Sequence, residues 1–379
     1  MKNLLIFSTA LVLLCCVNQI FAQQTINGTI MHDNLEREYI LYVPANYDAS
    51  NSVPLVINFH GYTSNAQQQM FYGDFRPIAD QAGFLVVQPQ GTLDNTGTTH
   101  FNVGWGQSTV DDVGFTSALL DTLAAEYAIN MERVYSTGMS NGGFMSYLLA
   151  CELSDRIAAI ASVTGSMTPN FIPCTPNHPM PVLEIHGTED ETVPYEGAIF
   201  ATDIDEVVQH WVKFNNCDEE PMFEEIEDFN TSDMSTVEHY VYENGDNDVN
   251  TELFKIIGGG HTWPGTAFAF GSTNQDINAS EEVWKFFDRY DINGLRETTS
   301  ASTFVPRSVV EAFPNPSSGV VNLKFENAAY RNYTIYSLVG EPILEGISNA
   351  DQAAIDLSEY PQGVYIFKSE NKVIRLVKF

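Results

Sequence analysis

Between residues 25 and 290, short apolar runs alternate with stretches in which apolar residues recur every three or four positions. Short apolar runs are typical of strands buried inside a sheet, and the wider spacing is typical of helices with one buried face. The predicted strands are 38–43, 54–59, 84–88, 133–137, 158–163, 182–185 and 253–257, and the predicted helices are 113–126, 144–153, 205–214 and 280–290. This alternation predicts an α/β fold with a mostly parallel central sheet covered on both faces.

The hydrophobic pattern changes after residue 293. Residues 294–308 lose the periodicity and are rich in Thr and Ser, which is typical of a linker. Short alternating strands separated by turn residues are predicted at 320–325, 333–338, 363–367 and 373–379. Such strands indicate a small all-β sandwich. We therefore expect an α/β domain at 23–293, a linker at 294–308 and a β-sandwich domain at 309–379.

Residues 1–22 have the pattern of a secretion signal. Lys2 precedes an apolar run at 4–17, and Ala22 offers a small residue for cleavage before Gln23. A lipoprotein signal at Cys15 is a weaker alternative, because a leucine rather than a small residue precedes it. The apolar run is shorter than a membrane span, and no later segment has 18 consecutive apolar residues, so we expect no membrane span in the mature chain.

The charge balance narrows the choice of partners. The chain has 49 acidic and 17 basic residues, a formal net charge of −32, and nearly all of the excess lies in residues 23–308. A surface this negative repels phosphate backbones, so we expect no nucleic-acid partner. Residues 218–228 are interpreted as a solvated acidic loop. A calcium site there is a weaker alternative, because the spacing of its carboxylates is irregular.

Three of the five cysteines remain after removal of the signal: Cys151, Cys174 and Cys217. An odd number in an exported protein suggests one disulfide and one buried thiol. Cys151 lies in an apolar helical run, so we expect it in the core. The predicted disulfide is therefore Cys174–Cys217.

A nucleophile motif stands between a predicted strand and a predicted helix. Residues 138–142 read Gly-Met-Ser-Asn-Gly, which fits G-x-S-x-G in the context that the motif needs. The glycines permit a sharp, strained turn, and the helix N-terminus behind it favours negative charge. An ordinary glycine-rich loop is the alternative. The motif predicts Ser140 as a catalytic nucleophile.

A serine hydroxyl needs a general base, and in this arrangement the chain order is serine, acid, histidine. His261 follows the predicted strand 253–257 and a run of three glycines, so it can reach back over the sheet. His210 lies inside a predicted helix and His239 inside the alternating run 237–242, so both are expected to be structural. His261 is the predicted base.

The acid is expected after the strand that precedes the base. Asp190 follows the predicted strand 182–185 and would hold the imidazole in its tautomer. Glu189 is the fallback. Asp203 and Asp205 satisfy the chain order but are expected to cap the next helix.

The remaining candidates surround this triad. His60-Gly61 closes the strand 54–59, and such a pair opens the oxyanion-hole loop of many hydrolases. The backbone amides of Tyr62 and Asn141 are the predicted donors, with His60 itself structural. Two tryptophans are predicted to contact substrate, with burial in the core as the alternative, and an aspartate pair is expected to cap the helix 113–126. These four residues are Trp105, Trp263, Asp111 and Asp112. We expect no cofactor and no metal.

Five motifs in chain order carry a resemblance to a known family. They are His60-Gly61, Val110 to Phe115, Gly138 to Gly143, His186 to Asp190 with Val193 to Tyr195, and Gly259 to Gly265. With them, residues 35–290 resemble secreted esterases of the polyhydroxybutyrate depolymerase family, whose relatives include feruloyl and acetyl xylan esterases. The resemblance implies an α/β-hydrolase fold and the same triad, Ser140, Asp190 and His261. It leaves the ester open.

The tail has a resemblance of its own. Residues 313–319, 363–365 and the basic ending 372–379 resemble the type A sorting domain of the type IX secretion system. The resemblance implies export across an outer membrane, followed by removal of the tail or attachment to the cell surface. An adhesive or carbohydrate-binding sandwich is the alternative.

These observations predict a secreted serine esterase that releases feruloyl or acetyl groups from plant cell-wall polysaccharide such as xylan. The expected partners are this acylated polysaccharide and the type IX machinery. One alternative is a polyhydroxybutyrate depolymerase, although no second module for gripping a solid polyester is visible. An inactive carbohydrate-binding surface protein is disfavoured by the complete triad. A serine peptidase is disfavoured because no propeller or large lid domain is visible.

Overall fold

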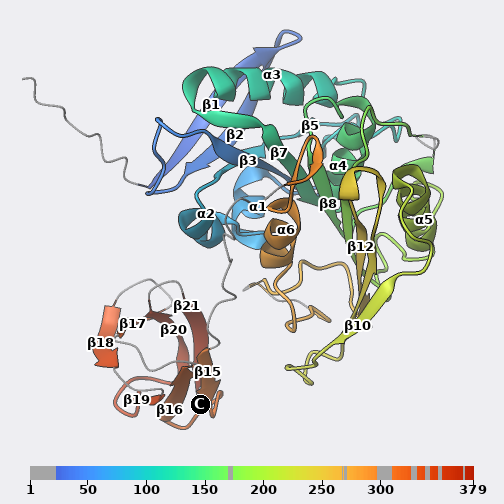
Figure 1. Cartoon of the computed structure of the whole chain (residues 1–379). Coiled ribbons are helices and arrows are strands. Elements are labelled where there is room, and N and C mark those ends of the chain that lie inside the picture. The colour runs from blue at the N-terminus through green and yellow to red at the C-terminus, as the bar shows by residue number, and fades with distance from the viewer. Residues whose placement is uncertain are drawn as a thin grey trace, which may run out of the picture. The chain divides into compact units, whose positions relative to one another are not determined.

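The computed structural model describes residues 23–169, 174–266, 268, 271–296, 310–325, 331–337, 342–348, 352–369 and 372–379. The chain forms two compact units, residues 1–299 and 300–379 (Figure 1). The predicted signal lies outside the described residues, and so do residues 297–308 of the predicted linker. The start of that linker is folded, because β13 (Tyr290–Asp291) pairs with β14 (Gly294–Leu295).

The first unit is built on one 10-stranded sheet with the strand order β1-β2-β4-β3-β7-β8-β9-β12-β11-β10. The strands are β1 (Gln24–His32), β2 (Leu35–Val43), β3 (Val53–Phe59), β4 (Leu85–Pro89), β7 (Ile129–Met139), β8 (Ala159–Val163), β9 (Val182–Gly187), β10 (Met222–Ile226), β11 (Thr236–Tyr242) and β12 (Thr251–Ile257). Strands β4 to β12 in this order pair in parallel, and antiparallel strands flank them on both edges. This is the α/β-hydrolase topology that the sequence predicts.

Helices cover both faces of the sheet (Figure 1). They are α1 (Ala66–Tyr72), α2 (Arg76–Ala82), α3 (Asp112–Glu126), α4 (Asn141–Glu152), α5 (Ile204–Asn215) and α6 (Ala279–Phe287). Consecutive residues of β7 show why the sheet needs a helical layer on each face. Val134 joins the core that contains the inner faces of α3 and α4, whereas Tyr135 stacks on Phe287 of α6. Because successive strand residues point to opposite faces, both faces of this central strand are buried.

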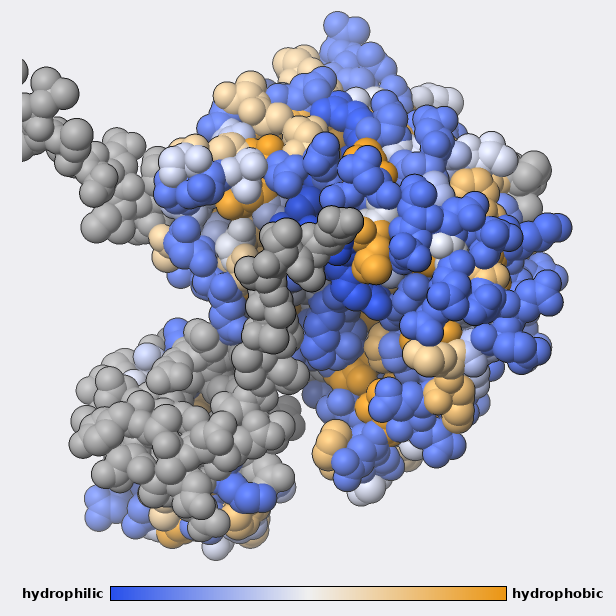
Figure 2. Space-filling model, viewed as in Figure 1, coloured by the Kyte–Doolittle hydropathy of each residue, from blue (hydrophilic) through white to orange (hydrophobic). Residues whose placement is uncertain are grey.

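The acidic stretch 218–228 differs from its expected form as a loop. It contains β10, which pairs with β11 at the outer edge of the sheet. The strand was not predicted because its side chains are mostly exposed, so the sequence lacks an apolar alternation there. Hydrophilic side chains also predominate over the larger unit in the view of Figure 2, with apolar ones in small groups.

The second unit, taken by itself, is the predicted sandwich. One antiparallel sheet holds β15 (Val310–Phe313), β16 (Val320–Phe325) and β19 (Gln352–Asp356), and the other holds β18 (Pro342–Ser348), β17 (Arg331–Ser337), β20 (Gly363–Ser369) and β21 (Lys372–Lys378). Its core draws residues from both sheets, among them Leu323 and Ile355 of the first and Ile335 and Phe367 of the second. This unit therefore has a core of its own.

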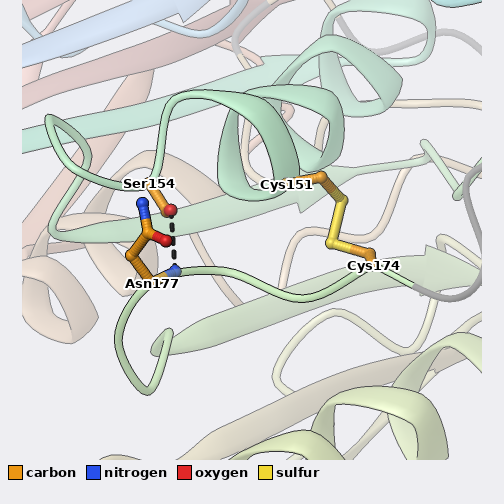
Figure 3. Close-up of a disulfide and its surroundings, with 4 residues drawn as sticks. All are labelled: Cys151, Ser154, Cys174 and Asn177. Atoms are coloured by element: carbon orange, nitrogen blue, oxygen red, sulfur yellow. Dashed lines mark hydrogen bonds between the residues drawn. A yellow bond between two sulfur atoms is a disulfide. The ribbon is translucent and has the colours of Figure 1, made fainter.

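The predicted disulfide Cys174–Cys217 is wrong. Cys151 and Cys174 form the disulfide (Figure 3), with Cα atoms 5.3 Å apart. Cys217 is a buried free thiol. Cys151 lies at the last turn of α4, where its side chain is only half-buried and can meet the segment before β9. That segment is also tied to the end of α4 by the Asn177 amide, which donates to the Ser154 hydroxyl at 2.9 Å (Figure 3).

Replacing Cys151 and Cys174 together with serine is expected to lower the free energy of unfolding by about 2–4 kcal/mol, because the cross-link restricts the unfolded chain. Chemical denaturation without reductant measures the difference. Cys217→Ala is the matched control, because it should remain sensitive to added reductant whereas the double variant should not. Three reactive thiols in the unfolded, unreduced mature protein would contradict the observed pairing.

Candidate active site

Ser140 occupies the sharp turn between β7 and α4. Its backbone has φ +54° and ψ −120°, a conformation that residues with a side chain rarely adopt. The turn is tight because a Cβ on Gly142 would lie 2.2 Å from the Phe59 carbonyl oxygen. Glycine at this position therefore lets the backbone of the turn approach β3, and the strained Ser140 is held at the carboxyl end of the parallel strands, at the N-terminus of α4.

The predicted acid and base meet at the same edge. Asp190 follows β9 and His261 follows β12, and these neighbouring parallel strands end side by side. The His261 Nδ1 donates to the Asp190 Oδ2 at 2.7 Å. The other carboxylate oxygen of Asp190 accepts from the amides of Thr192 and Val193, each at 2.8 Å. With a proton on Nδ1, the Nε2 of His261 is the ring nitrogen left to accept one.

Ser140 and His261 line one cavity of about 590 Å³. Its lining residues are Gly61, Tyr62, Ser64, Gln68, Gln69, Phe71, Tyr72, Met139, Ser140, His261 and Phe268. Four of the lining side chains are aromatic, those of Tyr62, Phe71, Tyr72 and Phe268, so the pocket is largely apolar, with the serine and the imidazole at its wall. The volume lies within the range of roughly 300–1,000 Å³ that is typical of small-molecule sites.

The two predicted oxyanion donors are free to bind. Gly61 lies so close to the serine that a Cβ there would be 3.3 Å from the Ser140 Cβ. Among the residues that the structure describes, neither the Tyr62 amide nor the Asn141 amide donates a hydrogen bond to the protein. Tyr62 lines the cavity, and Asn141 is the first residue of α4. Two unsatisfied amides beside a nucleophile can stabilise a developing oxyanion.

His60 fixes the direction of one of these amides. The ring is buried, its Nδ1 lies 2.8 Å from the Gly61 carbonyl oxygen, and its Nε2 accepts from the Gly91 amide at 2.9 Å. A carbonyl only accepts, so the Nδ1 carries the proton and the Nε2 is bare. The carbonyl of Gly61 and the amide of Tyr62 belong to one planar peptide and point in opposite directions. By holding that carbonyl, His60 therefore orients the Tyr62 amide.

His60→Ala is expected to lower kcat by about 10²-fold to 10³-fold, the usual effect of losing one oxyanion donor, with little change in KM. Steady-state kinetics of the purified variant test this. A rise in KM with unchanged kcat would instead mean that His60 acts on substrate binding.

The same histidine makes stability depend on pH. Burial lowers the pKa of His60 to about 4 from its ordinary value of 6.5. Between these two pH values His60 is protonated in the unfolded chain but not in the folded chain, so falling pH favours unfolding. This group should remove about 3 kcal/mol of stability as the pH drops across that window. Urea unfolding at several pH values measures the free energy of unfolding. For His60→Gln this free energy should fall less steeply with falling pH than for the wild type.

A hydrogen-bonded network that the sequence did not reveal supports the turn. The Asn141 side chain bonds both backbone groups of Phe101, accepting from its amide at 2.7 Å and donating to its carbonyl at 3.0 Å. The next amide, that of Asn102, donates to the Asp112 carboxylate at 2.7 Å. Asp112 is fully buried in an ion pair with Arg37, so its carboxylate does not cap α3 as expected, and Asp111 alone has that role. Arg37 is 75 positions away, which no local motif could indicate.

The two predicted substrate-contacting tryptophans lie elsewhere. The prediction for Trp263 is wrong, because its ring is 1% exposed, donates to the Ser280 hydroxyl at 3.1 Å and packs edge-on against Phe75. Trp105 is half-buried against Tyr62 and Phe200 and is not among the cavity-lining residues. A direct contact between Trp105 and substrate stays a prediction.

The other candidate acids have structural positions. Glu189 is exposed and Asp203 caps α5, as expected. Asp205 accepts from the Tyr195 hydroxyl at 2.6 Å. Asp111 caps α3 through the Gly114 amide at 2.7 Å. The structure therefore brings Asp190, and none of these alternatives, to the imidazole of His261.

The two histidines expected to be structural lie outside the cavity. His210 is part of α5 and packs edge-on against Trp211. His239 of β11 bonds the Glu252 carboxylate at 3.1 Å. Within the described part of the chain, one group could hold a metal ion, His32 with Asp33 and Asp111, and none of its members lines the cavity. Both aspartates are exposed.

Two family models match the chain. Residues 37–170 match the model described as "Esterase PHB depolymerase". Residues 311–378 match the model described as "Secretion system C-terminal sorting domain". Both resemblances expected from the motifs are confirmed. The sorting domain places the protein outside the cell or at its surface. Among the described residues, no helix is long and apolar enough to cross a membrane.

Two curated relatives that match the chain are both named as esterases. The chain is 29% identical over 242 residues to feruloyl esterase B of Piromyces equi, covering 59% of this chain and 42% of the relative. It is 32% identical over 179 residues to a bifunctional acetylxylan esterase/xylanase of Neocallimastix patriciarum, covering 46% of this chain and 24% of the relative. The chain therefore spans less than half the length of either.

Solved structures that match the chain include two esterases. An acetyl xylan esterase from Aspergillus awamori has a TM-score of 0.49 and 13% identity, covering 71% of this chain and 99% of its own. The feruloyl esterase module from Clostridium thermocellum, complexed with sinapinate, has a TM-score of 0.42 and 13% identity, covering 68% of this chain and 90% of its own. Both TM-scores are below 0.5, and the fold is defined by the strand order of the sheet.

Proposed function

We propose that this protein is a secreted serine carboxylic-ester hydrolase that releases feruloyl or acetyl groups from plant cell-wall polysaccharide such as xylan. The observation that carries the proposal is the bond between His261 and Asp190, together with the shared cavity of His261 and Ser140. A strained serine, an oriented imidazole and two free amides are the parts that acyl transfer needs.

The reaction uses these parts in two half-reactions. The Ser140 hydroxyl attacks the ester carbonyl carbon while the His261 Nε2 takes its proton, and the Tyr62 and Asn141 amides bind the resulting oxyanion. Collapse breaks the ester bond, and the imidazolium returns the proton to the leaving alcohol oxygen of the polysaccharide. Water then attacks the acyl-enzyme by the same route, releasing the acid and restoring Ser140. Asp190 stabilises the imidazolium in both halves.

The cavity favours an aromatic acyl group over acetyl. At about 590 Å³ it would be mostly empty around an acetyl group. Phe71 and Phe268 are respectively 42% and 52% exposed at its wall, which suits offset or edge-on packing of an aromatic ring. We therefore expect feruloyl esters to be better substrates than acetyl esters. The names of the two curated relatives support both substrate classes, feruloyl in one and acetylxylan in the other.

Initial rates on methyl ferulate, acetylated xylan and amorphous polyhydroxybutyrate test the substrate. Ferulate release should be fastest. Phe71→Ala should raise KM for methyl ferulate about tenfold while acetate release changes little, since one aromatic contact is lost. Phe229→Ala is the matched control, because this exposed phenylalanine is not among the lining residues. Release of hydroxybutyrate with negligible ferulate and acetate would overturn the polysaccharide assignment in favour of the polyester alternative.

The sorting domain suggests a partner for export. We propose that residues 311–378 engage the type IX secretion machinery, which then removes the domain or attaches the protein to the surface. The matched family model and the separate core of this unit support the proposal.

A further inference from the structure

A second histidine–carboxylate pair lies directly behind the proposed triad acid. Glu184 and His186 are alternate residues of β9, so their side chains share one face of the sheet. Both side chains are fully buried. The His186 Nδ1 lies 3.0 Å from one Glu184 oxygen, and the Tyr147 hydroxyl donates to the other at 2.7 Å. No step of the proposed reaction uses this pair.

The far side of the His186 ring faces Asp190. Its Nε2 lies 2.8 Å from the Val193 carbonyl oxygen and 3.5 Å from the Asp190 Oδ2. Because a carbonyl can only accept, the Nε2 must carry a hydrogen. That Asp190 oxygen is the same one that accepts from His261. The Nε2–H, fixed by its bond to the Val193 carbonyl, therefore lies beside the Asp190 oxygen that orients the His261 imidazole.

The proton of this pair is shared inside the protein. Burial raises the pKa of Glu184. Burial by itself would lower the pKa of His186, but the carboxylates of Glu184 and Asp190 raise it above its ordinary value. Whether the shared proton sits on Glu184 or on the Nδ1 of His186, the pair has no net charge and the Nε2–H is retained. An isolated buried charge behind the triad is thereby avoided.

We propose that His186, oriented by Glu184, is a positioning residue that holds the Asp190 carboxylate in place and aimed at His261. The proposal rests on the proposed triad. The Nε2–H stabilises the charged form of Asp190, and its bond to the Val193 carbonyl holds the turn whose amides bind the other Asp190 oxygen. Removal of the donor should let the Asp190–His261 pair hold its proton more tightly.

The surrounding groups allow this effect to be isolated. The titratable groups that face the pair are Tyr147 of α4, Tyr195 with its partner Asp205, and Lys255 of β12, whose ammonium lies over the Tyr195 ring at 4.5 Å. None of them lies between His186 and Asp190, which are in direct electrostatic contact. Substitution of His186 therefore acts on Asp190 without removing another charge.

The test compares pH profiles of kcat/KM for ester hydrolysis. Glu184→Leu with His186→Leu replaces the pair by apolar side chains and leaves no buried charge. It should lower kcat about 100-fold, as a misplaced catalytic group does, and move the acidic limb of the profile to higher pH. Glu184→Gln can donate its amide to the His186 Nδ1, keeps the Nε2–H and should keep the wild-type limb. His239→Gln, at a partly buried histidine–carboxylate pair outside the cavity lining, is the matched control.

The outcomes separate this proposal from the proposed function. An unshifted limb in the double leucine variant, with wild-type kcat, would overturn the positioning role while leaving the triad intact. A loss of stability without any shift of the limb would also overturn it, since a structural role predicts that result. Retention of activity in Ser140→Ala would instead remove the triad itself. Imidazole ¹⁵N spectra give a second readout, because His186 should remain protonated at Nε2 across the active pH range.

Discussion

Replacing Ser140 with alanine is expected to lower ester hydrolysis by about 10⁴-fold or more while the protein stays folded. The hydroxyl is the only group of the turn that can form the acyl-enzyme, and its loss leaves just the cavity and the two amides. The fold should survive, because alanine adds no atoms to a turn that already tolerates a Cβ at φ +54°. Initial rates with methyl ferulate measure the effect, and circular dichroism checks the fold.

Asp190→Asn and His261→Ala should be similarly severe, because each removes one side of the bond that orients the imidazole. His210→Ala and His239→Ala are the controls and should retain activity, since both histidines lie outside the cavity lining. Survival of a tenth of the activity in a clean Ser140→Ala preparation would rule out the assigned nucleophile. The same rate in all the variants would point to a contaminating esterase.

The sequence was sufficient to bring Asp190 to His261 and to place Ser140 at the same cavity, because each residue follows a strand that a local pattern identifies. Ser140 lies in a motif with fixed glycines, and Asp190 and His261 follow the buried strands β9 and β12. Parallel strands carry their carboxyl ends to one edge, so chain order translates directly into proximity. The spacing of apolar residues predicted the alternation of strands and helices and the separate β-sandwich.

The parts that the sequence missed depend on partners far apart in the chain. Asp112 was expected to cap a helix because its partner Arg37 lies on β2. Cys151 was placed in the core because its helix is apolar. It lies at the end of α4, where it is only half-buried and can reach Cys174. Trp263 follows the base in sequence but packs beneath Tyr72, whose hydroxyl meets its amide at 3.3 Å. Proximity to a motif does not determine the direction of a side chain.

The aromatic wall of the cavity was missed for a different reason. Phe71 and Tyr72 belong to α1, a helix of only seven residues that contains three successive glutamines. Two turns are too short for the three-to-four spacing to stand out from a loop. The signal that could have identified it is Asn65, which caps the helix by accepting from the Gln68 amide at 2.9 Å.

Removing residues 309–379 is expected to abolish export in the native host and to leave catalysis unchanged in the purified protein. All three triad residues and every described residue of the cavity wall belong to the first unit, which has its own core. The second unit has a separate core and matches a sorting-domain model over residues 311–378. Because each unit buries its own apolar residues, loss of one should leave the other folded.

The measurement is the share of protein in the medium and on the cell surface, together with kcat/KM of the truncated enzyme. The matched control is a variant that keeps the tail but carries Ser140→Ala, which should be exported normally without activity. It separates the sorting signal from any effect of turnover on export. Appearance of the truncated protein in the medium at the wild-type level would refute the sorting role. A fall in kcat/KM of the purified truncated protein would instead make the β-sandwich part of the enzyme.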